Sequence, residues 1–353
     1  MRTFNYSTLE QRSWGMDVLN LVAKIHECKG RQDLFVRQRP VELERLTETA
    51  RMQSTESSNK IEGIVTSSAR IKQLFHEKVS PRNQNENEII GYRDVLTTVC
   101  ESYDHVTIKP TCILQMHRDL LAKAALPEAG QFKKVQNYVN EKLADGTLIT
   151  RFVPANPTFT PDAITNICSA YEQAASLENI DALILIPAFV FDFLCIHPFS
   201  DGNGRISRLL TLLLLYKSGY KVGKYVSIEH QMEVTKDRYY ASLEQSDVGW
   251  HEGRNDPTPF IRYMLQVLLA CYMEFEKRVN MEENTMSKCL AYDIVKKCVQ
   301  GKIGKISAGE VVTDCPRLAK SSVLREIKKL VEEGMLTRIG GGRSTYYIRS
   351  DSK

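Results

Sequence analysis

The sequence predicts a mostly helical protein with one β-hairpin in its body and a small separate module at its C-terminus. Apolar residues recur three and four positions apart through most of the chain, as they do in amphipathic helices. Two strand-like runs, 131–140 and 147–153, flank an Asp-Gly turn signal at 145–146. Pro154 then stops further strand pairing. A lone hairpin in a helical protein is expected to be either a lid over a site or a plain surface hairpin.

The 353 residues are enough for two or three domains. Residues 1–87 are expected to form an N-terminal helical region. The polar, proline-containing segment 80–89 marks a boundary, after which residues 88–280 are expected to form a helical core. Residues 287–350 make up the C-terminal module. The hydrophobic fraction of 42% and the charged fraction of 25% are those of an ordinary soluble globular protein.

Cysteine usage and the absence of targeting patterns indicate the cellular compartment. The nine cysteines are widely scattered without a CxxC pair, which favours reduced thiols and excludes a disulfide framework or a cysteine zinc site. The first residues have no apolar core or cleavage pattern, so we expect no signal peptide. The most apolar segment, 182–196, contains Asp192 and is expected to be a buried helix. We therefore expect a cytoplasmic protein without membrane contact.

The C-terminal module has the element order of a winged helix-turn-helix. Helices are expected at 287–300, 307–313 and 319–333, and strands at 335–339 and 344–349 around a glycine turn at 340–343. In such a module the third helix would be the recognition helix. From residue 287 onward, 14 Lys and Arg against 7 Asp and Glu give a charge of +7, which leaves −3 for the body.

This basic module gives the alternative function from a different class, a DNA-binding regulator. The residues that could contact DNA phosphates are Arg325, Lys328, Lys329, Arg338 and Arg343. The same charges are equally compatible with the solvated surface of a winged helix that contacts protein. The sequence leaves both interpretations open.

The segment 197–208, HPFSDGNGRISR, combines groups that suit anion binding. The glycines at its centre free the backbone to turn its N–H groups inward. A helix is expected from Arg205 onward, with Arg205 and Arg208 in its first turn on one face. The helix macrodipole disfavours cations there, so their presence makes sense if a polyanion binds at the same N-terminus.

Two further residues of this segment suit phosphate transfer. Asp201 beside a phosphate would be a natural ligand for Mg²⁺, which takes few protein carboxylates plus phosphate oxygens. His197, which titrates near neutrality, is the candidate general base. Each residue alone has an ordinary explanation, such as Phe199 as a core anchor or the glycines as a turn. Their occurrence together at a helix end favours a phosphate-transfer site.

HPFSDGNGRISR resembles the HxFx(D/E)GNGRxxR motif of the Fic (Fic/Doc) family at every defined position. The similarity extends to 114–121 as the family's early helix and to 130–139 as its β-hairpin flap. Residues 239–243 and 256–265 resemble the helices that close the fold. The resemblance covers most of residues 1–280 and implies a mostly α protein with a Fic fold core.

The resemblance implies an adenylyltransferase that moves AMP from ATP to a Ser, Thr or Tyr hydroxyl of a target protein. On this basis His197 deprotonates the hydroxyl, Asp201 holds Mg²⁺ and Arg208 grips the γ-phosphate. The groups implied to stabilise the charge on the phosphoryl oxygens are Gly202, Asn203, Gly204 and Arg205.

The resemblance also implies contacts for the base and the target. Tyr239 and Tyr240 would border the adenine. The flap would align the target segment as an added strand, through Asn137, Tyr138, Val139 and Asn140. Three departures from the family pattern affect these contacts: lysines at 133–134 where arginine is frequent, PANP at 154–157 in place of PPxP, and Asp247 where an asparagine near the base is common.

A second motif lies upstream, in SNKIEG at residues 58–63. Ser58 and Glu62 are four residues apart on one helix face, and Gly63 suits the position after a helix end. A carboxylate at a helix C-terminus calls for a cation, although a solvated glutamate is the ordinary alternative. The stretch resembles the (S/T)xxxE(G/N) inhibitory motif of Fic proteins in the class II arrangement. By that resemblance Glu62 pairs with Arg208 and blocks a productive γ-phosphate position.

Related activities stay open. Fic-fold proteins also transfer other phosphate-containing groups, although the intact GNGR and Arg208 favour AMP transfer. Members with the inhibitory motif can also remove AMP, in which case Glu62 would orient water. The resemblance is compatible with a homodimer, and modification of the protein's own hydroxyls in trans is expected as a side reaction.

Overall fold

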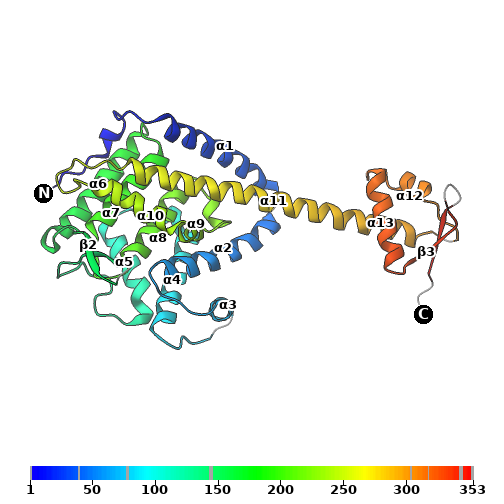
Figure 1. Cartoon of the computed structure of the whole chain (residues 1–353), viewed down its shortest axis with the longest axis horizontal. Coiled ribbons are helices and arrows are strands. Elements are labelled where there is room, and N and C mark those ends of the chain that lie inside the picture. Colours follow the sequence, from blue (N-terminus) through cyan, green and yellow to red (C-terminus); the bar gives the residue numbers. More distant parts are fainter. Residues whose placement is uncertain are drawn as a thin grey trace. The chain divides into compact units, whose positions relative to one another are not determined.

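Helices make up most of the computed structural model, which describes residues 2–38, 40–76, 79–142, 146–302, 304–316, 318–341 and 345–350. The chain divides into two units, Met1–Glu276 and Lys277–Lys353 (Figure 1). Each unit contains one two-stranded antiparallel sheet within the described residues. The prediction of a mostly helical protein with a β-hairpin in its body is confirmed.

The first unit begins with helices that precede segment 197–208, the predicted catalytic motif. They are a 3₁₀ helix at Tyr6–Leu9, α1 at Met16–Gln38, α2 at Pro40–Ile61, α3 at Ser68–His76, α4 at Gln84–Ser102 and α5 at Pro110–Leu121. Residue 88, the expected start of the core, lies inside α4, which packs on both α2 and α5. A Cβ at Gly91 of α4 would lie 1.9 Å from the Leu120 carbonyl oxygen, so only glycine permits this close approach to α5.

Helix α7 packs against both α6 and α8 in the first unit. The bounds of α6, α7 and α8 are Thr160–Leu177, Ala182–Ile196 and Asn203–Lys217. Helix α7 is apolar around nearly its whole circumference, and almost all of its residues are buried, as expected for a core helix. Within the described residues, no helix combines the length and apolarity needed to span a membrane.

The hairpin predicted in the body is present but shorter than expected. Strand β1, Val139–Lys142, pairs antiparallel with β2, Leu148–Phe152. The predicted first strand at 131–140 is therefore wrong for most of its length. The chain before β1 bonds instead to the loop at 197–203, here named the catalytic loop for its predicted role, for example through the Lys133 N–H and the Pro198 carbonyl oxygen at 2.8 Å. Asp145 of the predicted turn lies outside the described residues.

Helices α9 at Ile228–Val234 and α10 at Lys236–Asp247 complete the body, together with the first part of α11, Thr258–Gln300, whose last part belongs to the second unit. Helix α11 corrects the prediction of separate helices at 256–265 and 287–300. From Phe260 to Gln300 the sequence has neither glycine nor proline, so nothing in it breaks the helix.

The second unit has the element order that the sequence predicts. Helix α12, Ala308–Asp314, and helix α13, Lys320–Glu332, precede the antiparallel strands β3, Leu336–Ile339, and β4, Tyr346–Arg349. Their buried apolar core includes Val311, Val323, Ile327, Leu330 and Leu336. Assignment of this unit as a winged helix stays a prediction, and Arg343 lies outside the described residues.

Candidate active site

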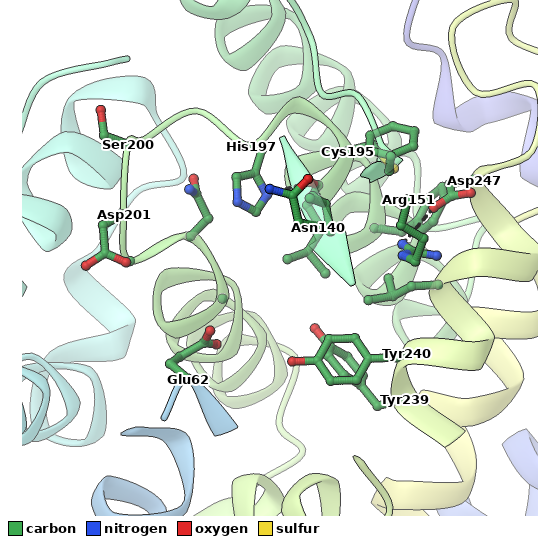
Figure 2. Close-up of a pocket in the computed structure, with 18 residues that line it drawn as sticks. Glu62, Asn140, Arg151, Cys195, His197, Ser200, Asp201, Tyr239, Tyr240 and Asp247 are labelled. Atoms are coloured by element: carbon green, nitrogen blue, oxygen red, sulfur yellow. Dashed lines mark hydrogen bonds and ion pairs between the residues drawn. The ribbon is translucent and has the colours of Figure 1, made fainter. Parts of the chain in front are cut away.

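The catalytic motif opens into a cavity of about 310 Å³ in the first unit (Figure 2). Residues of the loop from His197 to Asn203 and the first turn of α8 line one end, with Glu62 beside them. Strands β1 and β2, helix α10 and the C-terminal part of α7 line the rest. Segments that are far apart in the sequence therefore converge on one space large enough for a small ligand.

His197 caps the C-terminus of α7 in a left-handed backbone conformation, with φ of 51°. Its Nδ1 lies 3.1 Å from the Leu194 carbonyl oxygen, which accepts a hydrogen bond only if Nδ1 carries the proton. Burial lowers the pKa of His197 to about 4, so the ring is neutral at pH 7. The neutral ring then keeps the lone pair of Nε2 free, and the residue lines the cavity.

The loop that follows His197 is fastened by amide side chains. Asn203 accepts a hydrogen bond from the Phe199 N–H at 2.9 Å and donates one to the Phe199 carbonyl oxygen at 2.7 Å. Asn137 donates to the carbonyl oxygens of His197, at 3.1 Å, and Phe199, at 2.9 Å. The side chain of Asn203 is thus occupied within the loop, which leaves its backbone and the two flanking glycines to face a ligand.

Two residues support this loop in a way that sequence reasoning did not foresee. His117 of α5 stacks on Phe199 with ring centroids 3.7 Å apart, and its Nε2 lies 3.1 Å from the Asp201 carbonyl oxygen. Lys133 donates to the Ile196 carbonyl oxygen at 3.0 Å, and burial lowers the pKa of its amine to about 8. Both residues bind main-chain carbonyl oxygens of residues that are distant in the sequence. No local sequence pattern therefore predicts these contacts.

Arg205 is fully buried and pairs with two carboxylates. Its Nη1 lies 2.6 Å from Glu88 Oε2, and its Nη2 lies 2.9 Å from Asp201 Oδ2. Arg205 does not line the cavity, whereas Asp201 does and keeps 64% of its side chain exposed. Arg205 therefore orients the Asp201 carboxylate at the edge of the cavity. Glu88, its buried partner on α4, was not anticipated from the sequence.

Arg208, which is also buried, binds the end of α2. Its Nε donates to Ser58 Oγ at 2.8 Å, and its Nη2 donates to Glu62 Oε1 at 2.7 Å. Burial opposes ionisation of Glu62, but the Arg208 charge and hydrogen bond outweigh it, so the pKa of Glu62 falls below its ordinary value. Nη1 of Arg208 is buried and has no hydrogen-bond partner within the described residues.

The Glu62 carboxylate also lies on the N-terminus of α8. A Cβ placed on Gly204 would come within 2.1 Å of Glu62 Oε1, so only the bare Cα leaves room for this carboxylate. Gly63 follows with φ of +80°, the left-handed conformation that suits a glycine just after a helix end. The carboxylate is thus held where a helix N-terminus favours negative charge.

Polar contacts with α9 and the residues after it hold the end of α2 in place. Ser57 Oγ donates to Glu233 Oε2 at 2.6 Å, and Lys60 Nζ lies 2.6 Å from Glu233 Oε1. Lys236 Nζ donates to the Ile61 carbonyl oxygen at 2.7 Å, which satisfies a carbonyl at the helix end.

The part of the cavity away from Asp201 combines aromatic and charged groups. Tyr239 is buried, and its ring centroid lies 5.2 Å from that of Tyr240, which also lines the cavity. At the far end, Arg151 of β2 pairs with Asp247 of α10 at 2.9 Å (Figure 2). Of the flap residues singled out in the sequence, Val139 and Asn140 line the cavity, Asn137 fastens the catalytic loop, and Tyr138 is exposed.

Comparison with known proteins agrees with the motif. Residues 107–215 match the family model "Fic/DOC family". The chain is 31% identical over 184 residues to protein adenylyltransferase fic-1 of Caenorhabditis elegans, covering 51% of this chain and 32% of that protein. It is 27% identical over 234 residues to protein adenylyltransferase Fic of Culex quinquefasciatus, covering 63% of this chain and 41% of that protein. The chain thus spans about a third to two-fifths of these relatives.

A solved structure supports the fold over nearly the whole chain. The crystal structure of a Fic family protein from Desulfovibrio desulfuricans matches with a TM-score of 0.64 and 19% identity, covering 97% of this chain and 98% of that one. At this identity the likeness speaks for the fold alone, and it confirms the predicted Fic fold core. Residues 107–215 of the present chain therefore belong to a Fic/DOC family domain, and the chain is homologous to the Fic protein adenylyltransferases.

Proposed function

We propose that this protein transfers AMP from ATP to a hydroxyl group of a target protein. Nε2 of His197 takes the hydroxyl proton while the hydroxyl oxygen attacks the α-phosphorus. The bond from that phosphorus to the oxygen bridging to the β-phosphate breaks, and pyrophosphate leaves. The neutral His197 ring, whose Nδ1 is occupied by the Leu194 carbonyl oxygen, suits this role because Nε2 is free to accept a proton.

The N-terminus of α8 is the proposed phosphate site. Backbone N–H groups at 202–204 and the positive end of the helix dipole would face the phosphates and the charge that develops during transfer. Arg208, with a buried and unpartnered Nη1 among the described residues, would add a charged donor for the γ-phosphate.

The single observation that carries this proposal is the position of the Glu62 carboxylate. This anionic group lies against Gly204 and binds Arg208 at 2.7 Å, so protein groups already favour an anion there. A terminal phosphate would bind the same groups, and both anions cannot occupy the position together. We therefore propose that Glu62 inhibits transfer by competing with the γ-phosphate, and that Ser58 holds the arginine in place for it.

The residues present are compatible with Mg²⁺ brought in by the nucleotide. Within the described part of the chain, no group of three or more His, Cys, Asp and Glu side chains could hold a metal by itself. Asp201 offers one exposed carboxylate beside the proposed phosphate site, and Mg²⁺ commonly takes one or two carboxylates plus phosphate oxygens and water. When bound there, the ion would supply positive charge against the phosphates. Arg205 would keep the Asp201 carboxylate aimed at it.

Labelled ATP tests the reaction class directly. The wild type and the Glu62→Gly variant are incubated with Mg-ATP labelled at either the α- or the γ-phosphate, with the protein itself and a cell extract as acceptors. We expect protein-bound label from α-labelled ATP only, with a gain in intact mass that matches AMP. Label from γ-labelled ATP alone would show phosphate transfer instead and would overturn the proposal.

Removal of AMP is a second candidate because Glu62 and His197 line the same cavity. A carboxylate there could orient a water molecule toward a phosphate bound to a modified hydroxyl. Incubation of an AMP-modified protein with the wild type and with Glu62→Gly separates the two directions. Release of AMP by the wild type but not by the variant would favour removal as the main activity.

The second unit gives less support for DNA binding. Three of the cations of α13 pair with acids on this helix or just after it: Arg325 with Glu326 at 2.7 Å, Lys328 with Glu332 at 3.6 Å and Lys329 with Glu333 at 4.0 Å. Such internal pairing lowers the charge available for phosphates and favours protein contact. A gel shift of the full chain at rising salt tests this, because salt-sensitive DNA binding would favour the regulator.

A further inference from the structure

Arg208 is held by Ser58 as well as by Glu62. Its Nε donates to Ser58 Oγ at 2.8 Å, and its Nη2 donates to the Ser58 carbonyl oxygen at 2.9 Å. Both residues are buried, so these contacts are removed from water. A buried cation that loses one partner needs the others to hold it. When Glu62 leaves, Arg208 therefore depends on Ser58 for its position.

The Ser58 hydroxyl is part of a buried series of hydrogen bonds between helices α2, α4 and α9. Tyr92 of α4 is fully buried, and its hydroxyl donates to Glu229 Oε1 of α9 at 3.1 Å. Burial raises the pKa of Tyr92 well above its ordinary value, and the charge of Glu229 adds to this rise. The charge of Arg208 and a hydrogen bond with Ser58 oppose the rise of this pKa. The Tyr92 hydroxyl thus lies between Ser58 and Glu229.

Glu229 is a buried carboxylate that is bound by hydroxyl groups. Its Oε1 accepts from Tyr92, and its Oε2 accepts from Ser227 Oγ at 3.3 Å. Ser227 Oγ accepts in turn from Ser54 Oγ of α2 at 2.9 Å. Among the residues that the structure describes, no Lys, Arg or His side chain forms an ion pair with Glu229. A negative charge therefore stands at one end of a series that has the positive charge of Arg208 at the other.

The two ends determine the direction of the hydrogen bonds between them. An arginine only donates and a carboxylate only accepts, so the hydroxyl groups between them direct their hydrogens toward the carboxylate. Tyr92 gives its one hydrogen to Glu229, and Ser58 therefore gives its hydrogen to Tyr92. The lone pairs of Ser58 Oγ then face the Nε of Arg208. A change at Glu229 is thus transmitted to Arg208 through two hydroxyl groups.

We propose that Tyr92 and Glu229 are positioning residues that keep Arg208 in place for the γ-phosphate when Glu62 no longer binds it. The inference rests on the proposed function, in which Arg208 binds that phosphate. It also gives Ser58 a role in the active state, because the hydroxyl that accompanies the inhibitory contact aligns the arginine for the nucleotide. A purely inhibitory Ser58 would become dispensable once Glu62 is removed.

Binding of ATP and ADP isolates this role, because the two nucleotides differ only in the γ-phosphate. Every protein carries Glu62→Gly, which frees the proposed phosphate position, and His197→Ala, which prevents transfer during the measurement. Tyr92→Phe, Glu229→Gln and the combination of both are added to this parent. Calorimetric titration with Mg-ATP and with Mg-ADP gives the ratio of the two dissociation constants.

The matched control is Tyr6→Phe. Tyr6 is also buried, and its hydroxyl donates to Asp192 Oδ2, a buried carboxylate of the same unit, at 3.0 Å. This variant removes the same kind of hydrogen bond outside the series that ends at Arg208, so it reports the effect of lost stability alone. Arg208→Ala is the reference for complete loss of the γ-phosphate contact. Circular dichroism and thermal unfolding check that each variant folds.

We expect the parent to bind ATP about 10- to 100-fold more tightly than ADP, the range for one hydrogen bond to a charged group, and Arg208→Ala to lose most of this preference. Tyr92→Phe and Glu229→Gln should each lower it about three- to tenfold, in line with one neutral hydrogen bond, and leave ADP binding unchanged. The double variant should match Tyr92→Phe, because that change already interrupts the series. Tyr6→Phe should keep the preference of the parent.

Three results would overturn the assignment. The first is a preference that Arg208→Ala removes while Tyr92→Phe and Glu229→Gln both keep it, which would leave the γ-phosphate site intact. The second is an equal loss of affinity for ATP and ADP. The third is a parent that binds ATP no better than ADP, which would also contradict the proposed γ-phosphate position.

Two further measurements keep the outcomes apart. Should Tyr92→Phe fail to fold, Glu229→Gln, which preserves the shape of its side chain, decides the assignment by the same ratio. Transfer of AMP is measured separately with Glu62→Gly alone. Its absence would contradict the proposed reaction, whereas the ratio of ATP to ADP binding would still decide the roles of Tyr92 and Glu229.

Discussion

The catalytic loop and the end of α2 meet at Arg208, but they are held in different ways. The loop is fixed by buried contacts, such as the stack of His117 on Phe199 and the pair of Arg205 with Glu88. The end of α2 combines buried contacts, such as the hydrogen bond of Arg208 to Ser58, with ion pairs nearer the surface, such as that of Lys60, whose side chain is 58% exposed. Buried contacts of this kind are costly to break, whereas exposed ion pairs contribute little. We therefore propose that the Glu62 carboxylate can leave Arg208 more readily than the loop at 197–203 can change its geometry.

The largest expected effect is loss of the base in the catalytic loop. His197→Ala in the Glu62→Gly background is expected to lower transfer about 10²- to 10⁴-fold, the usual contribution of a general base. Nucleotide binding should change little, because His197 is not part of the proposed phosphate site. Transfer of labelled AMP and calorimetric binding of ATP measure the two properties. Undiminished transfer would exclude His197 as the base.

Removal of the Glu62 carboxylate tests whether the end of α2 inhibits transfer. Glu62→Gly is expected to raise transfer about tenfold to a hundredfold, because one charge-assisted hydrogen bond to Arg208 no longer competes with the nucleotide. Glu62→Gln, which keeps the size but lacks the charge, should give an intermediate rate. Initial rates with α-labelled ATP check both variants. Equal rates in the wild type and Glu62→Gly would rule out inhibition by this residue.

A smaller rise in the transfer rate is expected when the contacts that hold the end of α2 are weakened and Glu62 itself is kept. Glu233→Gln weakens the contacts to Ser57 and Lys60 and should raise transfer about two- to fivefold, in line with the value of partly exposed ion pairs. The matched control is Glu101→Gln, whose side chain is 63% exposed and pairs with Arg51 in the middle of α2, away from Glu62. A similar gain in both variants would show general loosening of the helix instead.

The sequence predicts those site residues that lie close together in the chain and misses those that come from separate helices. The groups from His197 to Arg208 are contiguous, and their spacing at a helix end constrains their geometry. The pair of Glu62 and Ser58 also has a local signature, four residues apart before a glycine. Glu88 and His117 have none, because they act from separate helices on an arginine and on a main-chain carbonyl.

The fold can also be predicted only where local sequence patterns determine it. Periodicity predicts the helices well, but it does not show where polar connections end and helices continue. Helix α11 runs through the polar stretch near residue 285 because no glycine or proline interrupts it. The strand-like residues before Val139 do not form the expected strand, since their hydrogen bonds go to the loop around His197. Tertiary bonding of this kind leaves no trace in local composition.

The smallest expected change is that of the transfer rate with pH, which depends on the pKa of His197. Burial, together with the nearby Lys133 charge, lowers the pKa of His197 to about 4. The neutral, active form is then lost only as pH falls toward 4, so at pH 6 about 99 in 100 molecules would keep it. A histidine with its ordinary pKa would have lost about three quarters of this form by pH 6.

The transfer rate of Glu62→Gly should therefore stay nearly constant between pH 8 and pH 6. ATP binding is measured at each pH to correct for the titration of the nucleotide. A fall to about a quarter with unchanged binding would mean that His197 reaches water during the reaction.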